Sequence, residues 1–267
     1  MASPPNLHVE HHGSGPPLVF AHGFGGSARN FRPQARAFSD RFRVVLYDAR
    51  GHARSEAPEA PSAYEERELV GDFTRIARAV GPQVVAGGLS LGAYTALRHA
   101  LAHPDSVRAL VLAALPSGSD AEGRVEWALG FAEAIEREGL ERAGERYVWG
   151  EAARFDPKGA ALIRQGLMEH APHALSAILR RVLARIPPVD AFAAELSALA
   201  IPTLVLVGGE DEESLAPSRR LAELLPNAEL AVVPGAGHVV NLVAPTEFNA
   251  RVATFLERLS ESAAPRS

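Results

Sequence analysis

The stretch Gly87-Gly88-Leu89-Ser90-Leu91-Gly92 joins two different hydrophobic patterns. Before it, the apolar residues 84–86 are typical of a buried strand, and after it apolar residues recur at helical spacing over 93–101. A serine with a glycine two residues away on either side, between a strand and a helix, has the sequence of a nucleophile elbow. The turn is so tight that Cβ atoms at its closest approaches would collide, which explains Gly88 and Gly92. In the alternative interpretation, Ser90 only caps the following helix.

Outward from this turn, short apolar runs alternate with amphipathic helical patterns. The apolar runs suit parallel strands buried on both faces, and they lie at residues 18–21, 44–47, 84–86, 107–113, 203–207 and 229–233. Two helical stripes are clearest, one at Leu69, Phe73, Ile76 and Val80 and the other at Phe248, Val252, Phe255, Leu256 and Leu259. This alternation predicts an α/β fold with a mostly parallel, doubly wound sheet covered by helices on both sides.

Residues 117–200 break the alternation, because they contain helical patterns and no convincing strand. A structureless loop of this length is improbable, so we expect a helical lid over the sheet. The predicted domains are therefore a core of residues 1–116 and 201–267 and a lid of residues 117–200. Large apolar side chains of the lid are candidates for a substrate pocket, namely Trp127, Phe131, Trp149, Phe155 and Met168. The alternative is that these side chains only anchor the lid by packing.

The composition excludes several classes of protein. With 47% hydrophobic and 22% charged residues, the chain of 267 residues has ample material for a globular core. A net charge of −5 gives no electrostatic reason to expect a nucleic-acid partner. The absence of cysteine excludes disulfides, thiolate metal sites and a cysteine nucleophile. We see neither a signal peptide nor a membrane span, which predicts a soluble, cytoplasmic protein and leaves its oligomeric state open.

A serine hydroxyl is a poor nucleophile unless a base removes its proton, and the chain offers ten histidines. His238 is the first candidate because it follows a strand and a glycine loop in VVPGAGHVVNL and precedes a helix. His52, in ARGHARS after another strand, is the second candidate. Others fit a solvated edge strand (His8, His11 and His12) or predicted helices without a positional argument (His99, His103, His170 and His173).

The base needs a carboxylate that orients it, and the loop after strand 203–207 supplies acidic residues. Asp211 is preferred, while Glu210, Glu212 and Glu213 remain alternatives. An earlier glycine-rich loop, FAHGFGG at residues 20–26, is expected to form an oxyanion hole from the backbone N–H groups of Phe24 and Leu91. No G-x-G-x-x-G or G-K-[ST] motif is present, so we expect no nucleotide cofactor.

Over nearly its whole length the chain resembles the α/β-hydrolase superfamily. The resemblance lies in HGSGPPLVFAHGFGGS, VLYDARGHARS, GGLSLGA, HPDSVRALVLA, IPTLVLVGGEDEE and PGAGHVVNLVAPTEFNARVATFLE. It implies Ser90 as nucleophile, Asp211 as acid and His238 as base, with Phe24 and Leu91 at the oxyanion hole and no metal or other cofactor. It also implies a lid after the sixth strand of the family. The short N-terminal segment suggests a sheet of seven strands.

Within this superfamily the motifs are similar to those of carboxylesterases and enol-lactonases. The resemblance therefore implies hydrolysis of a small carboxylic ester or lactone through an acyl-enzyme. A cofactor-free carbon–carbon lyase or hydrolase, or a perhydrolase, would use the same triad and remains an alternative. An alternative of another class is a ligand receptor with the hydrolase fold and little turnover. Asp48, Arg50 and Gly51 are expected to be structural.

Overall fold

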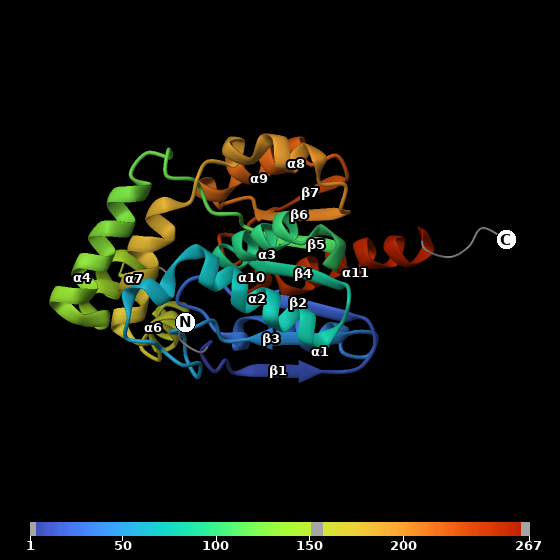
Figure 1. The fold of residues 1–267 in the computed structure, drawn as a ribbon. Helices are drawn as coiled ribbons and strands as arrows, with labels where there is room; N and C mark the ends of the chain where they lie inside the picture. The colour runs from blue at the N-terminus through green and yellow to red at the C-terminus, as the bar shows by residue number, and fades with distance from the viewer. Residues whose placement is uncertain (1–3, 151–156, 263–267) are drawn as a thin grey trace.

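The structure is a computed structural model that describes residues 4–150 and 157–262 (Figure 1). Its centre is a seven-stranded sheet in the order β1-β3-β2-β4-β5-β6-β7. The strands are β1 (Val9–His12), β2 (Pro17–Ala21), β3 (Arg43–Tyr47), β4 (Val84–Leu89), β5 (Val107–Ala113), β6 (Thr203–Gly208) and β7 (Ala228–Val233). β1 pairs antiparallel with β3, and all other pairs are parallel. The predicted α/β fold is confirmed, and each of the six apolar runs forms a strand.

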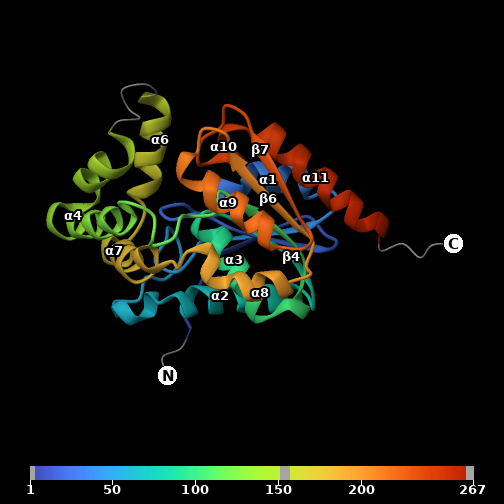
Figure 2. The same cartoon turned by 90° about the horizontal axis from the view of Figure 1, so that it is seen from above.

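Helices cover both faces of the sheet, as the view from above shows (Figure 2). One face is covered by α2 (Glu66–Val80), α3 (Leu91–Ala102), α8 (Ala193–Ala198) and α9 (Glu212–Leu224). The other is covered by α1 (Arg32–Phe38), α10 (Val240–Val243) and α11 (Pro245–Ser262). The two predicted helical stripes lie on α2 and α11, and their large side chains Phe73 and Phe248 are completely buried. The fold therefore has two apolar cores, one on each side of the sheet.

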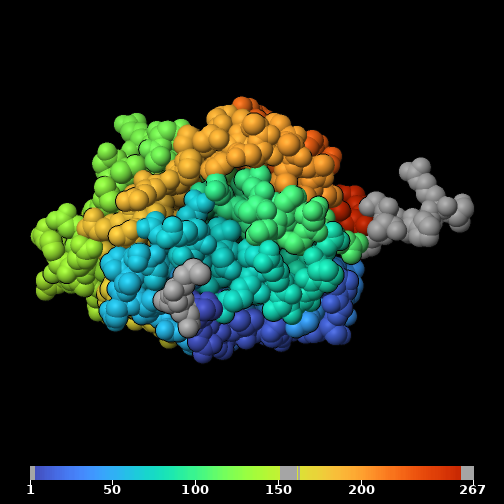
Figure 3. All heavy atoms as spheres, in the orientation of Figure 1, coloured from blue at the N-terminus to red at the C-terminus, as the bar shows by residue number. Residues whose placement is uncertain are grey.

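A helical insertion, defined here as residues 114–202, separates β5 from β6. Its main helices are α4 (Arg124–Gly144), α6 (Pro157–Leu167) and α7 (Pro172–Arg181), followed by α8. α4, α6 and α7 stand beyond one end of the sheet, at the left in Figures 1 and 3. Short helical turns complete the chain, namely Ala28–Phe31, Pro61–Tyr64, Pro104–Ser106, Glu145–Trp149, Leu183–Arg185 and Val189–Phe192.

The strand order brings distant loops together. Parallel strands end at the same edge of a sheet, where α/β proteins bind their ligands. β2 pairs with β4, and the series continues through β5 and β6 to β7. The loop after β2, the turn after β4 and the loops after β6 and β7 therefore meet at this edge. The predicted triad and Phe24 lie in these four connections, and Leu91 is the first residue of α3, directly after the turn that follows β4.

Candidate active site

Ser90 lies in the strained turn between β4 and α3. Its φ of 54° and ψ of −118° are unusual for a residue with a side chain. A Cβ added to Gly88 would clash with the backbone of Gly92, and one added to Gly92 would clash with the carbonyl oxygen of Ala21. The Ser90 side chain makes no capping hydrogen bond to α3, although the residue occupies the N-cap position. The backbone thus has the geometry of a nucleophile elbow, and the capping alternative receives no support.

The structure brings Asp211 and His238 together across the loops after β6 and β7. Asp211 Oδ2 lies 2.9 Å from His238 Nδ1, and this carboxylate is buried while the imidazole is 44% exposed. Burial raises the pKa of Asp211, but the hydrogen bond and the charge of His238 outweigh it, so the pKa is lowered overall. Glu210, the adjacent alternative, is exposed. In the described structure its side chain forms no hydrogen bond or ion pair.

Ser214 is a contact of this pair that sequence reasoning missed. It is completely buried in the first turn of α9, with its Oγ 3.3 Å from His238 Nδ1. Its backbone N–H donates to Asp211 Oδ1 at 3.4 Å, because Asp211 caps α9. The sequence signal for this contact was the spacing of Asp211 and Ser214, because an aspartate three residues before a serine can cap the helix in which that serine lies. Both side chains therefore restrict the position of the imidazole.

No hydrogen bond joins Ser90 Oγ to His238 in the described part of the chain. Catalytic hydrogen bonds are often long without substrate and shorten in the complex, so His238 remains the candidate base. What the structure provides is an exposed imidazole whose Nδ1 is held by a buried carboxylate. The other ring nitrogen, Nε2, has no protein partner among the described residues and is available for proton transfer.

The loop after β2 lies directly against the serine. A Cβ added to Gly23 would come within 3.4 Å of Ser90 Cβ. Within the described ranges, the backbone N–H groups of Phe24 and Leu91 donate to no protein acceptor. Unpaired backbone donors beside a strained serine are what an oxyanion hole requires. These two N–H groups therefore remain the predicted oxyanion hole.

His52, the second candidate for the base, has neither ring nitrogen free. Its Nδ1 donates to the Arg50 carbonyl oxygen at 3.1 Å, and its Nε2 accepts from the Gly25 N–H at 3.2 Å. Burial, together with His22 and His170, holds the pKa of His52 well below its usual value. This ring is therefore a structural connection between two loops. The sequence could not predict these two hydrogen bonds of His52, because their partners are backbone atoms, which every residue has.

The DARGHARS segment has the structural role expected for it. Asp48 is completely buried and accepts hydrogen bonds from the Ala28 N–H at 2.7 Å and the Arg54 guanidinium at 2.7 Å. Arg50 is also buried and pairs with Asp72 at 2.7 Å. The Arg50–Asp72 ion pair and the hydrogen bond from Ala28 fasten the loop after β3 to neighbouring elements, and the Asp48–Arg54 ion pair closes the loop on itself.

Two of the candidate pocket residues lie near the predicted oxyanion hole. The ring of Phe131, on α4, is 6.1 Å from the ring of Phe24 in a perpendicular arrangement. Trp127 lies one helical turn earlier, 5.8 Å from Phe131, and the Arg124 guanidinium lies over its indole at 4.9 Å. α4 therefore places an aromatic surface over the loop that follows β2.

The other candidates are placed differently. Trp149 is buried inside the helical insertion against Gly144, where an added Cβ would clash with its ring. Met168 is 42% exposed at the end of α6. Phe155 lies outside the described residues. Among the described candidates, Phe131 lies against Phe24, and Trp127 lies against Phe131.

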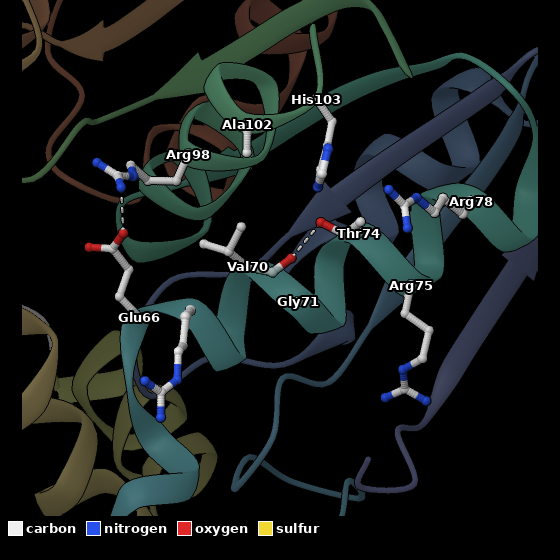
Figure 4. A pocket seen from close by; sticks show the side chains of 10 residues that line it. Glu66, Val70, Gly71, Thr74, Arg75, Arg78, Arg98, Ala102 and His103 are labelled. Atoms are coloured by element: carbon white, nitrogen blue, oxygen red, sulfur yellow. Dashed lines mark hydrogen bonds and ion pairs between the residues drawn. The ribbon is translucent and has the colours of Figure 1, made fainter. Parts of the chain in front are cut away.

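A groove of about 610 Å³ lies away from these residues, between α2 and α3 (Figure 4). Two arginines of the groove form ion pairs: Arg98 pairs with Glu66 at 3.0 Å, and Arg75 pairs with Asp72 at 3.1 Å. Figure 4 shows these side chains pointing in different directions, with no common point for an anion. The groove is lined by none of the predicted active-site residues.

Within residues 4–150 and 157–262, no group of three or more His, Asp or Glu side chains is arranged to hold a metal ion. The helices in the same ranges are all too short or too polar to cross a membrane. The sheet edge described above is therefore the site from which we derive a chemical function.

Comparisons with known proteins agree with this fold. The family model for the alpha/beta hydrolase fold matches residues 16–245. A putative carbamate hydrolase of Rhizobium rhizogenes is 32% identical, and the match covers 96% of this chain and 99% of that protein. A 2-(acetamidomethylene)succinate hydrolase of Mesorhizobium japonicum is 29% identical, over 90% of this chain and 87% of the relative.

Solved structures are also similar. A thermophilic esterase from Thermogutta terrifontis, solved with malate bound, has a TM-score of 0.83 and 27% identity, covering 95% of this chain and 93% of that one. The enol-lactonase of Burkholderia xenovorans has the same fold, with a TM-score of 0.83 at 24% identity over 95% of this chain and 97% of the lactonase. This chain therefore belongs to the alpha/beta hydrolase family.

Proposed function

We propose that this protein is a serine hydrolase that cleaves a small carboxylic ester or lactone through an acyl-enzyme. The observation that carries the proposal is the hydrogen bond of 2.9 Å between Asp211 and His238 at the sheet edge where Ser90 occupies a strained turn. A nucleophile, a base and a carboxylate that orients the base are the three parts that acyl transfer requires.

In the proposed mechanism, Ser90 Oγ attacks the carbonyl carbon while His238 Nε2 takes the hydroxyl proton. Asp211 accepts from Nδ1–H, which keeps the ring in the required tautomer and stabilises the imidazolium. The carbonyl oxygen becomes an oxyanion and accepts hydrogen bonds from the N–H groups of Phe24 and Leu91. The tetrahedral intermediate then collapses, and the leaving alkoxide takes the proton from His238.

A water molecule completes the cycle by the same steps. His238 removes a proton from water as the hydroxide attacks the acyl carbonyl, and it returns that proton to Ser90 Oγ when the acid leaves. For a lactone, the leaving alcohol stays attached to the acyl chain, so ring opening gives a hydroxy acid. Every step uses the same two N–H donors, because both intermediates carry the charge on the same oxygen.

Several kinds of acyl bond fit the proposed mechanism. The relatives are named for an acetamidomethylene compound, a carbamate, esters and an enol-lactone, all of which contain an acyl carbon that a serine could attack. The aromatic surface of Phe131 and Trp127 over the loop after β2 favours an apolar acyl group. We therefore place esters and lactones first.

Steady-state turnover tests this proposal. Purified protein should release p-nitrophenol from esters of increasing acyl length over many cycles, and it should open lactone rings. Ser90→Ala should abolish both activities, whereas Ser197→Ala, an exposed serine on α8 that bonds only to its own helix, should keep them. Release that stops after about one equivalent would instead support a receptor, and full activity in Ser90→Ala would refute the proposed nucleophile.

A further inference from the structure

His170 connects the helical insertion to the loop after β2. The sequence predicted this histidine on a helix, but it lies in the turn between α6 and α7. Its exposed fraction is only 5%. Its Nε2 lies 2.8 Å from the carbonyl oxygen of Gly25, and its Nδ1 lies 2.8 Å from the backbone nitrogen of Ala53. A carbonyl only accepts and an N–H only donates, so the ring must be neutral with its proton on Nε2.

His52 holds the same glycine from the other side. Its Nε2 accepts from the Gly25 N–H at 3.2 Å, and its ring lies 5.0 Å from the ring of His170. Both polar backbone atoms of Gly25 are thus bonded to histidine side chains. Gly25 has a φ of +67° in a loop that contains three glycines, so the chain here is intrinsically permissive. The turn is closed by the Gly26 N–H, which donates to the Gly23 carbonyl oxygen at 3.0 Å, and the two histidines hold it from outside.

Further contacts join the insertion to the same region. A Cβ added to Gly25 would lie 2.7 Å from Leu167 Cδ1, and the Phe131 ring packs on Phe24. These are apolar contacts, which restrict volume but do not orient a peptide group. The hydrogen bonds do orient peptide groups. His52 holds the Phe24–Gly25 peptide by its N–H, and His170 holds the next peptide by the Gly25 carbonyl.

We propose that His170 is a positioning residue for the oxyanion hole, which it acts on by holding the Gly25 carbonyl. The Gly26 N–H of that same peptide group donates to the Gly23 carbonyl oxygen at 3.0 Å, and the Gly23–Phe24 peptide group carries the Phe24 N–H. This inference rests on the proposed function, because it assumes that the Phe24 N–H binds the oxyanion. Donors stabilise an oxyanion only when they are fixed at the right position beforehand. The helical insertion then contributes to catalysis through one side chain of its α6–α7 turn, in addition to covering the site.

Two substitutions separate the two bonds of this ring. Gln in place of His170 presents an amide N–H near the position of Nε2, so it can still donate to Gly25. Asn presents an acceptor oxygen near the position of Nδ1, so it can still bind Ala53 N–H but does not reach Gly25. A role in positioning predicts that Asn is the harmful substitution, whereas a role in anchoring the insertion predicts similar effects for both.

The experiment measures the rate at which diethyl 4-nitrophenyl phosphate phosphorylates the protein. The phosphoryl oxygen of this reagent would occupy the oxyanion hole, and each phosphorylated serine releases one 4-nitrophenolate, which is measured by its absorbance. His170→Asn should react at least about tenfold more slowly than the wild type, and His170→Gln within about threefold, with kcat for an ester falling in the same order and KM nearly unchanged. His173→Asn, at an exposed position on α7, is the matched control and should react like the wild type. Melting temperatures are measured for all variants.

The results distinguish the possibilities. Equal rates in His170→Asn and the wild type overturn the inference, and so do equal losses in the Asn and Gln variants accompanied by equal falls in melting temperature. A wild-type protein that does not react with the phosphate at all would refute the proposed function itself, and the inference would fall with it. A slow Asn variant beside a normal Gln variant supports both.

Discussion

At the scale of single residues, the choice between Asp211 and Glu210 shows what the chain order alone leaves open. Both stand on the loop after β6, and both side chains are long enough to reach a neighbouring histidine. The start of α9 decides, because Asp211 caps this helix and turns inward to His238, whereas Glu210 stays exposed. Sequence reasoning placed the acid within one loop and preferred Asp211, but the hydrogen bond to His238 is a property of the folded turn.

We expect Asp211→Asn to lower kcat by about two to four orders of magnitude, because the amide no longer holds the required tautomer of His238. Glu210→Gln is the matched substitution one residue earlier and should cost less than about tenfold. The measurement is kcat/KM for both variants on one ester. The reverse ranking would move the acid to Glu210.

A glycine pair tests the strain of the elbow. In Gly92→Ala the new Cβ would clash with the Ala21 carbonyl, so we expect loss of activity and a lower free energy of unfolding. Gly71→Ala, within α2, has no atom within 4 Å of the added Cβ and should raise stability by about 0.5–1 kcal/mol. Urea denaturation measures both. Equal stability in the two variants would contradict the tight turn.

At the scale of elements, the helical insertion was predicted in outline only. Its helical periodicity was visible in the sequence, but the contact between His170 and Gly25 spans 145 positions and has no periodic pattern. Aromatic residues in the insertion are equally ambiguous, because a tryptophan that packs and one that lines a pocket look alike in sequence. Only the fold separates Trp127, beside Phe131, from Trp149, buried on Gly144.

These two tryptophans should therefore respond differently to substitution. Trp127→Ala should change the relative kcat/KM values across acyl lengths, since this ring belongs to the aromatic surface near Phe24. Trp149→Phe should leave those relative values unchanged and lower the melting temperature, because it creates a cavity within the insertion. Chain-length profiles and thermal unfolding are measured for both. An altered profile in Trp149→Phe alone would reverse the assignment.

At the scale of the whole molecule, the alternation of apolar runs and helical stripes predicted the parallel sheet and its two covered faces. The order of the strands was not predicted, because pairing between distant strands leaves no local trace in the sequence. A solvated edge strand was expected near the N-terminus, and β1 is a short antiparallel strand at the edge of the sheet.

Buried neutral histidines should make the whole fold sensitive to acid. Burial lowers the pKa of His22 and of His99 to about 4, and it also lowers the pKa of His52 and His170. An unfolded histidine has a pKa near 6.5, so the unfolded state binds more protons as the pH falls from about 6.5 towards 4. Stability contributed by these residues is complete above pH 6.5 and decreases over that window.

Denaturant unfolding at pH 7.5, 6 and 5 checks this expectation. The free energy of unfolding should fall steadily across the three values, before the carboxylates with lowered pKa, such as Asp48 and Asp211, lose their contribution at lower pH. An equal free energy of unfolding at pH 7.5 and pH 5 would show that these histidines are not held neutral in the fold.

Trapping of the acyl-enzyme is the decisive experiment for the proposed nucleophile. Protein mixed with a p-nitrophenyl ester and quenched in acid within the first turnover is digested, and its peptides are analysed by mass spectrometry. We predict that the acyl group is found on Ser90 and that it forms at the same rate as a burst of about one equivalent of p-nitrophenol. Steady turnover with no acylated Ser90, or with the acyl group on another residue, would contradict this prediction.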